Sequence, residues 1–256
     1  MGVRSDLPTI YAIGDIHGRF DLLERAIEII RAHGRAGGRR LVFLGDYVDR
    51  GPQSREVVER LMALELEEDA IFLKGNHEDL MVQVLARGAT SRFRNWLENG
   101  GDETLASYGV GDDDDPREAV PAAHLAWMAA LPMTAEDGGR IFVHAGLAPG
   151  VALADQSEEA CLWIREAFLR ANAGAFEAHV VHGHTPRWTG KPEPSLPELL
   201  PHRTNLDTGA FATGVLAIGV FDPAVPGGPV ELLLARGEAI AWPRVGPPSR
   251  LSRWLR

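Results

Sequence analysis

The sequence predicts an α/β fold, and three observations support this prediction. A strand, a turn and a helix follow one another three times before residue 87. Short polar motifs flanked by glycine come directly after each of these three strands. From Arg140 onward, short apolar segments typical of strands dominate the chain. Repeated strand–helix units favour parallel strands with crossover helices, which place the carboxyl ends of the strands at one edge of a sheet.

The first three strands are predicted at residues 9–13, 40–44 and 70–73. Apolar residues at helical spacing indicate helices over 21–33, 54–66 and 78–86, with Asp21 as the cap of the first helix. Gly37 and Gly38 separate this first helix from the second strand. The loops after the strands cover residues 14–18, 45–51 and 75–78, and we expect them to meet at one edge of the sheet.

Residues 87–130 interrupt this pattern and are predicted to form a helical insertion beside the site, with one helix near 125–131. Four residues of the insertion either shape a wall of the substrate site or belong to ordinary helix packing with a glycine cap: Trp96, Asn99, Gly100 and Gly101. The acidic run from Asp112 to Asp115 is interpreted as a solvated loop, because short runs of like charge usually remain in water.

Six more strands are predicted at 141–145, 179–182, 204–207, 215–221, 230–235 and 238–242, with a helix over 158–171. Four prolines between residues 191 and 201 indicate a loop. We expect a single domain over residues 1–248. The short basic tail at 249–256 is either a frayed terminus or a partner-binding helix.

Composition limits the kinds of partner. The 256 residues carry a formal net charge of −10, which does not favour nucleic acid or an anionic membrane as a partner. Neither a signal peptide nor an apolar run of membrane-spanning length is expected, so a cytoplasmic location is predicted. Cys161 is the only cysteine, and its apolar neighbours indicate a packed thiol rather than a nucleophile. The oligomeric state remains open.

Five motifs carry the chemistry: Gly14-Asp-Ile-His-Gly18, Gly45-Asp-Tyr-Val-Asp-Arg-Gly51, Gly75-Asn-His-Glu78, Phe142-Val-His144 and Gly183-His-Thr185. Turn formation alone would explain single Asp and Gly residues, but not the whole set in this order. Carboxylate, amide and imidazole ligands suit Mn, Fe or Zn, and two adjacent ions of this kind indicate hydrolysis of a phosphate ester.

These motifs resemble those of the calcineurin-like metallophosphoesterases, and within them the phosphoprotein phosphatase branch with its bacterial and phage Ser/Thr phosphatases. The resemblance covers residues 10 to about 210. It implies a two-sheet β-sandwich of mixed strands flanked by helices, to which the helical insertion is added. It also implies two divalent metal ions, with Mn²⁺ expected and Fe or Zn as alternatives.

The resemblance assigns roles to individual residues. Asp15 and His17 would hold one metal ion and Asp46 would bridge both. Asn76, His144 and His184 would complete the second metal site. His182, close to this last ligand, is expected to pack in the interior rather than bind metal.

A second group of residues would act on the substrate. The resemblance implies that His77 donates a proton to the leaving group and that Asp49 orients it. Arg50 would hold the phosphate. The segment Trp163-Ile164-Arg165 matches a motif that supplies a second phosphate-binding arginine in related bacterial enzymes, and a surface ion pair is the alternative for Arg165.

The resemblance implies a phosphomonoesterase that hydrolyses phosphoserine and phosphothreonine in proteins by direct attack of a metal-bridging hydroxide. The intact Asp49-Arg50 pair and Glu78 after His77 favour this substrate. The alternative is a bis(5'-nucleosyl)-tetraphosphatase or another small-nucleotide phosphohydrolase, so the partner is a phosphorylated protein or a small phosphorylated substrate. An inactive scaffold is disfavoured because no ligand is missing, and a DNA-end nuclease because the chain is acidic.

Overall fold

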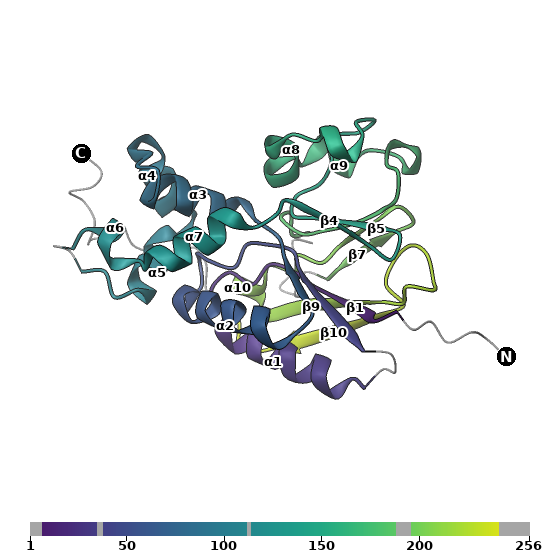
Figure 1. Ribbon diagram of the computed structural model, residues 1–256, viewed down its shortest axis with the longest axis horizontal. Coiled ribbons are helices and arrows are strands. Elements are labelled where there is room, and N and C mark those ends of the chain that lie inside the picture. Colours follow the sequence, from purple (N-terminus) through teal and green to yellow (C-terminus); the bar gives the residue numbers. More distant parts are fainter. Residues whose placement is uncertain (1–6, 35–37, 112–113, 188–195, 241–256) are drawn as a thin grey trace.

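Two five-stranded sheets pack face to face, and helices cover their outer faces (Figure 1). The structure is a computed structural model that describes residues 7–34, 38–111, 114–187 and 196–240. The strand order is β10-β9-β1-β2-β3 in the first sheet and β4-β5-β6-β8-β7 in the second. Parallel and antiparallel pairs occur in both sheets, so the prediction of an α/β fold with two mixed sheets is confirmed.

The first sheet is built from the two ends of the chain. Strands β1 (Thr9–Ile13), β2 (Arg39–Phe43) and β3 (Ala70–Phe72) are parallel, whereas β9 (Val215–Phe221) runs antiparallel to β1 and to β10 (Glu231–Arg236). The helices that follow the three parallel strands are α1 (Phe20–Ala32), α2 (Ser54–Glu67) and α3 (Asn76–Leu85). This is the predicted strand–helix repeat.

The second sheet comes from the middle of the chain. Strands β5 (Arg140–Val143), β6 (His179–His182) and β8 (Arg203–Asn205) are parallel, and β4 (Thr134–Asp137) and β7 (Glu198–Leu200) flank them as antiparallel edges. Its other segments are the helices α8 (Glu158–Trp163) and α9 (Glu166–Leu169) and the 3₁₀ turns η3 (Leu153–Asp155) and η4 (Ala173–Ala175). The short helix α10 (Ala210–Thr213) follows β8 and packs with the first sheet.

Alternation along the strands sorts the core into three layers, because successive side chains of a strand point to opposite faces. Tyr11 and Ile13 of β1 face the helices, whereas Ile10 and Ala12 pack against the second sheet. In the second sheet Phe142 points inward, and its neighbours on β5 point outward to α8 and α9. Both sheets are therefore buried on two faces, and the loops at the strand ends are held between rigid elements.

The insertion is helical, as predicted, and forms a lobe at one side of the sandwich (Figure 1). It contains η1 (Thr90–Arg92), α4 (Phe93–Trp96), the π-helical turn η2 (Leu97–Gly101), α5 (Asp102–Ser107), α6 (Pro116–Ala119) and α7 (Ala122–Ala130). Apolar residues of α3, α4, α5 and α7 belong to the same core cluster as the first sheet. The lobe is therefore continuous with the core of the fold.

Several local predictions were wrong. Asp21 does not cap α1, because the helix begins at Phe20 and the Asp21 carboxylate instead accepts two hydrogen bonds from Arg19. The helix predicted over 158–171 is broken into α8 and α9, with Arg165 outside helical dihedral angles at φ −129° and ψ −95°. Residues 238–240 form no strand.

Two strands were missed. The short edge strand β7 lies within the predicted proline-rich loop, and β4 lies in a stretch for which no strand was predicted. Some predictions fall outside the described residues, namely those for Gly37, Asp112, Asp113, residues 241–242 and the tail at 249–256.

Candidate metal centre

Loops from both sheets converge on one buried cluster of polar side chains. Asp15 and His17 follow β1, Asp46 follows β2, and Asn76 begins α3 after β3; His144 follows β5 and His184 follows β6. Parallel strands in each sheet bring these loop ends to the same edge. Each of the six residues is at most 5% exposed, so the cluster is removed from bulk water.

The carboxylate of Asp46 lies at the centre of this cluster. Its Oδ2 is 3.5 Å from Nε2 of His17, and its Oδ1 is 3.3 Å from Nε2 of His144. Among the described residues, two groups of His and Asp side chains could hold a metal ion, and both include Asp46. One group is His17, Asp46 and His77, and the other is Asp46, His144 and His184. The two oxygens of this carboxylate face different groups, as a residue shared between two ions would require.

Hydrogen bonds fix the orientation of two imidazoles. Nδ1 of His17 lies 2.9 Å from the carbonyl oxygen of Val48, and Nδ1 of His144 lies 2.9 Å from that of Leu44. A carbonyl oxygen only accepts, so each Nδ1 carries the proton and each Nε2 directs a lone pair into the cluster. Metal-binding histidines are usually oriented in this way.

Unsatisfied atoms provide a test of whether cations fit here. Oδ1 of Asp15 and Nε2 of His184 are buried and have no hydrogen-bond partner among the described residues. Oδ1 of Asn76 lies 2.9 Å from Nε2 of His144 and 2.8 Å from Nδ1 of His184. Buried polar atoms without partners are costly, and a cation would satisfy Oδ1 of Asp15, Oδ1 of Asn76 and the nitrogen of His184 that faces it, Nδ1. The donor set therefore fits divalent ions that accept oxygen and nitrogen ligands.

Burial also shifts the proton affinities of the cluster. It raises the pKa of Asp46 to about 7 and, together with Asp207 and Asp46, raises the pKa of Asp15 well above its usual value. Burial lowers the pKa of His144 to about 4 and the pKa of His17 well below its usual value. The site therefore favours neutral imidazoles and destabilises carboxylate charge, which a bound cation would offset.

One difference from the predicted ligand sets concerns Asp15 and His77. The compact group around His17 and Asp46 includes His77, whereas Asp15 was predicted as the third ligand. Oδ2 of Asp15 accepts a hydrogen bond from the His184 N–H at 3.0 Å, and only Oδ1 remains for a cation. Both residues line the cluster, and their separate roles remain predictions.

His77, Asp49 and Arg50 form a connected set beside the cluster. Nδ1 of His77 lies 2.7 Å from Oδ2 of Asp49, and its Nε2 lies 2.9 Å from a guanidinium nitrogen of Arg50. Arg50 also reaches Nε2 of His17 at 2.8 Å, and its guanidinium lies over the ring of Phe211. Burial and the Arg50 charge lower the pKa of His77, so in this arrangement its Nε2 accepts rather than donates.

Arg165 reaches the mouth of the site from the break between α8 and α9. Its guanidinium donates to the carbonyl oxygen of His184 at 3.2 Å and to Oγ1 of Thr185 at 3.0 Å. These partners belong to the fifth motif, so the structure places Arg165 beside the predicted site rather than in an ion pair along a helix. The break between α8 and α9, which was not predicted from the sequence, directs the Arg165 side chain toward the fifth motif.

Glu78 has a structural task in the site. Its two carboxylate oxygens accept the N–H groups of Asp46, Tyr47 and Gly75 at 2.8–2.9 Å and that of Val48 at 3.3 Å. From the sequence, Glu78 was interpreted only as a residue that favours a phosphoprotein substrate. Its position three residues after Gly75, as in a capping box, was the signal that could have shown this role.

Three further residues were missed or left undecided. Thr104 and Trp96 of the insertion donate to the carboxylate of Asp49, and Asp207 lies buried near Asp15. Asp207 follows β8 at the same sheet edge, which was an available signal. Nothing in the local sequence of the insertion indicated the contacts of Trp96 and Thr104.

His182 lies away from the cluster. Its ring packs at 4.8 Å against that of Phe168 of α9, and its Nε2 lies 3.2 Å from Arg203. Successive side chains of β6 point to opposite faces of the sheet, so His182 lies on the same outer face as Val180. This position agrees with the predicted packing role of His182.

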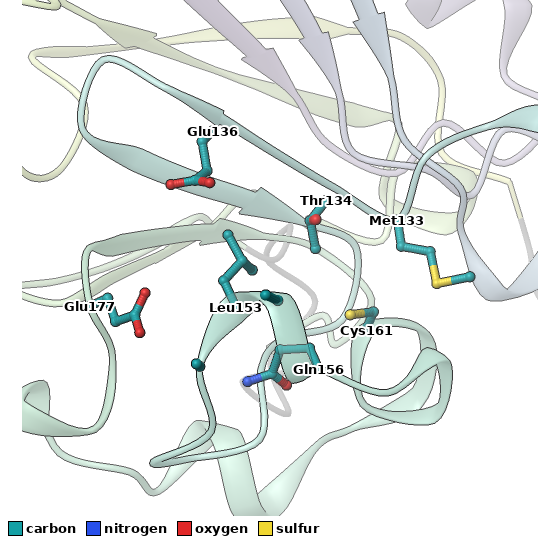
Figure 2. A pocket seen from close by; sticks show the side chains of 9 residues that line it. Met133, Thr134, Glu136, Leu153, Gln156, Cys161 and Glu177 are labelled. Carbon is teal, nitrogen blue, oxygen red and sulfur yellow. The ribbon is translucent and has the colours of Figure 1, made fainter.

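A pocket of about 590 Å³ opens between β4 and the segment from η3 to α8 (Figure 2). Its lining includes Met133, Leu153, Glu177 and Cys161, and none of the predicted site residues. Burial raises the pKa of the Cys161 thiol, so the thiol remains protonated, which agrees with a packed rather than a nucleophilic cysteine. No helix among the described residues has the length and apolar character needed to span a membrane.

Known proteins share this sequence pattern and fold. Over 180 residues, the chain is 30% identical to a symmetrical bis(5'-nucleosyl)-tetraphosphatase of Aromatoleum aromaticum, an alignment that covers 70% of this chain and 58% of that protein. Over 228 residues it is 25% identical to an asymmetrical bis(5'-nucleosyl)-tetraphosphatase of Anoxybacillus flavithermus, covering 80% of this chain and 86% of the relative.

A serine/threonine phosphatase structure from Saccharomyces cerevisiae superimposes with a TM-score of 0.57 at 17% identity, over 95% of this chain and 84% of that one. At this identity the likeness concerns the fold alone. The family model of the calcineurin-like phosphoesterases matches residues 8–208, which include all six predicted metal ligands. This chain therefore belongs to the calcineurin-like phosphoesterase family, whose members are metallophosphoesterases acting on phosphoesters.

Proposed function

We propose that this protein hydrolyses a phosphoanhydride bond in bis(5'-nucleosyl) polyphosphates. The observation that carries this substrate class is that relatives aligned over 70% and 80% of the chain are both named bis(5'-nucleosyl)-tetraphosphatases. The sequence motifs alone had favoured phosphoproteins. We give the two long alignments more weight than the Asp49-Arg50 pair and Glu78 as evidence for the substrate, because loops outside the motifs determine which substrate fits.

The predicted ligands would hold two divalent cations: Asp15, His17, Asp46, Asn76, His144 and His184. The chemistry that such cations supply when bound is activation of water at neutral pH and neutralisation of charge on the phosphate oxygens. Mn²⁺ remains our prediction for their identity. Two observations support cations at this position: Oδ1 of Asp15 is buried without a partner, and Oδ1 of Asn76 faces the imidazole nitrogens of His144 and His184.

The remaining residues of the site would bind the phosphate and supply a proton. In hydrolysis the oxygen of water forms a bond to phosphorus and the bridging P–O bond breaks. Arg50 lies in the loop after β2, and Arg165 lies between α8 and α9. The guanidinium groups of both residues would bind the non-bridging phosphate oxygens. An anionic substrate would draw Arg50 away from the imidazoles, which frees Nε2 of His77 to carry a proton.

A second candidate substrate is phosphoserine or phosphothreonine in proteins, and one observation favours it. Nδ1 of His77 lies 2.7 Å from Oδ2 of Asp49, which is the arrangement of an oriented proton donor. The alkoxide released from a serine ester needs protonation far more than the phosphate released from an anhydride does. A proton donor at His77 would therefore increase the rate of monoester hydrolysis more than that of anhydride hydrolysis.

One experiment separates these candidates. The purified protein, reconstituted with Mn²⁺, is offered diadenosine tetraphosphate, a phosphoserine peptide and a phosphodiester, and products are quantified by chromatography. We expect the highest kcat/KM for diadenosine tetraphosphate, with release of two ADP from symmetrical cleavage or ATP and AMP from asymmetrical cleavage. Preference for the peptide by ten-fold or more would replace the nucleotide proposal with the second candidate.

The matched control is Asp46→Asn, which keeps the shape of the shared residue but removes its charge. We expect this variant to bind metal at least about a hundred-fold more weakly and to lose nearly all activity, because an amide has one ligand oxygen and no negative charge and cannot serve both groups. Full metal content and full activity in Asp46→Asn would contradict the assignment of the centre itself.

A further inference from the structure

The carboxylate of Asp49 is held by three donors, and two of them come from the helical insertion. Nδ1 of His77 donates to Oδ2 at 2.7 Å. Nε1 of Trp96 lies 3.1 Å from Oδ1 and 3.0 Å from Oδ2, and Oγ1 of Thr104 donates to Oδ1 at 2.6 Å. Asp49, Trp96 and Thr104 are all 0% exposed, so water does not compete for these bonds.

Thr104 also holds the main chain of Asp49. The N–H of Asp49 donates to Oγ1 of Thr104 at 2.9 Å and to Oγ of Ser54 at 3.0 Å. Asp49 has a φ of 72°, a left-handed conformation that side-chain-bearing residues adopt only when their surroundings impose it. One hydroxyl therefore fixes both the backbone and the carboxylate of the residue that orients His77.

Two glycines make room for this arrangement: Gly101 for the indole of Trp96 within the insertion, and Gly100 for the contact between the insertion and Arg50. A Cβ on Gly101 would lie 2.5 Å from the indole ring of Trp96, and a Cβ on Gly100 would lie 2.5 Å from the backbone nitrogen of Arg50. The carbonyl oxygen of Gly100 accepts the Arg50 N–H at 3.2 Å. The turn at Asp49 and Arg50 is thus attached to the insertion by the main chain as well as by side chains.

We propose that Trp96 and Thr104 are positioning residues, which hold Asp49 so that His77 points its Nε2 at the leaving group. This inference rests on the proposed role of His77 as proton donor. A carboxylate that accepts hydrogen bonds from three fixed donors has little freedom to rotate. The imidazole that is hydrogen-bonded to it is therefore also held in one orientation. The insertion would then act on the chemical step and not only on the shape of the substrate site.

Two conservative changes test this inference. Trp96→Phe keeps a ring in the core but removes the N–H, and Thr104→Val keeps the shape but removes the hydroxyl. For each variant we measure kcat for a series of phosphate monoesters, from aryl esters with good leaving groups to alkyl esters with poor ones. We expect kcat for alkyl esters to fall about ten-fold or more while aryl esters change less than about two-fold, because only poor leaving groups need the proton.

Matched controls separate positioning from general damage. Trp127→Phe makes the same chemical change at an indole whose N–H donates to Glu65 and to no residue of the site, and we expect no selective effect. Thr104→Ser restores the hydroxyl and should recover most of the alkyl ester activity lost in Thr104→Val. Metal content, measured by elemental analysis, should be unchanged in all variants.

The outcomes distinguish this inference from the proposed acid role of His77, and the choice of natural substrate is tested separately with diadenosine tetraphosphate. Equal slowing of aryl and alkyl esters in Trp96→Phe and Thr104→Val, or no slowing in either, would overturn the positioning role. His77→Ala and Asp49→Asn are measured in the same series. If these two variants also lack a leaving-group dependence, the acid role of His77 fails; if they show it and the insertion variants do not, only the inference about Trp96 and Thr104 fails.

Discussion

Five residues with side chains have left-handed backbone conformations in the described part of the chain, and all of them lie in the site: His17, Asp46, Asp49, Arg50 and His184. Each such conformation costs roughly 1–3 kcal/mol and persists only when its surroundings impose it. At Asp46 the imposing contacts include Glu78, which accepts its N–H at 2.9 Å. The centre is therefore held in a strained conformation by the rest of the fold.

Arg165 offers a prediction at the scale of one residue. Arg165→Ala should raise KM, or weaken inhibition by inorganic phosphate, by about ten-fold with a smaller change in kcat, because a charged contact to the phosphate is lost. The control is Arg170→Ala, which removes an exposed arginine of the same region that pairs with Glu166. Identical kinetics in the two variants would show that Arg165 has no part in substrate binding.

At the scale of elements, the three motif loops of the first sheet are packed almost without space between them. A Cβ on Gly75 would lie 2.2 Å from Oδ1 of Asp46 and 2.7 Å from Oε2 of Glu78. This glycine is the N-cap of α3, directly before Asn76, and its φ of −94° would suit alanine. Close approach alone therefore requires glycine at this position.

Gly75→Ala should lower the free energy of unfolding by about 2 kcal/mol and weaken metal binding, because the added methyl displaces the carboxylate of Asp46. Chemical denaturation and calorimetric metal titration measure the two effects. Gly174→Ala is the control, since its Cβ would have Asn172 Oδ1 as its nearest neighbour at 3.6 Å and should change stability by less than about 0.5 kcal/mol. Similar effects of both substitutions would contradict the steric argument.

The sequence predicted the elements that are strongly periodic or strongly apolar. Strands β1, β6 and β9 were predicted with the bounds that the structure shows, and α2 to within one residue. Predictions from weak sequence patterns were wrong where a contact with another element determines the secondary structure. The strand β7 forms because β8 lies beside it, although prolines surround it, and α8 ends at Trp163 although helical spacing continues.

The site shows the same division. Glycine-flanked Asp, His and Asn residues could be found from motifs, because the motif itself builds the turn that presents them. Trp96 and Thr104 could not, because their contacts with Asp49 cross 47 and 55 residues of sequence and leave no local pattern. Their place in the site depends on how the insertion docks on the first sheet.

For the whole molecule, the buried carboxylates predict how stability depends on pH. Burial raises the pKa of Asp46 and of Glu78 to about 7, so the folded state holds protons that the unfolded state has released. This stabilising contribution is complete at low pH and is lost as pH rises through about 7. The lowered pKa of His144, about 4, and those of the other buried histidines, such as His17 and His77, act in the opposite direction, mainly below about pH 7.

Between about pH 7 and 8 free histidine is mostly neutral, so the carboxylates dominate, and Asp15 and Asp49, whose pKa values burial also raises, add to the loss. The metal-free protein should therefore lose on the order of 1–2 kcal/mol of unfolding free energy across this interval. Urea denaturation in the presence of a chelator measures this change. Saturating Mn²⁺ should abolish the loss, because cations stabilise the deprotonated folded state. Constant or increasing stability of the metal-free protein over this interval would be inconsistent with the buried carboxylates acting as described.

The sharing of Asp46 between two groups of ligands also has a consequence for biosynthesis. On the ribosome, the residues predicted to hold the first cation, Asp15, His17 and Asp46, are synthesised roughly 140 residues before His184. At roughly 5–20 residues per second this interval lasts on the order of 10–30 s. The nascent chain therefore carries the residues predicted for the first cation before His144 and His184 are made, and before β9 and β10 complete the first sheet.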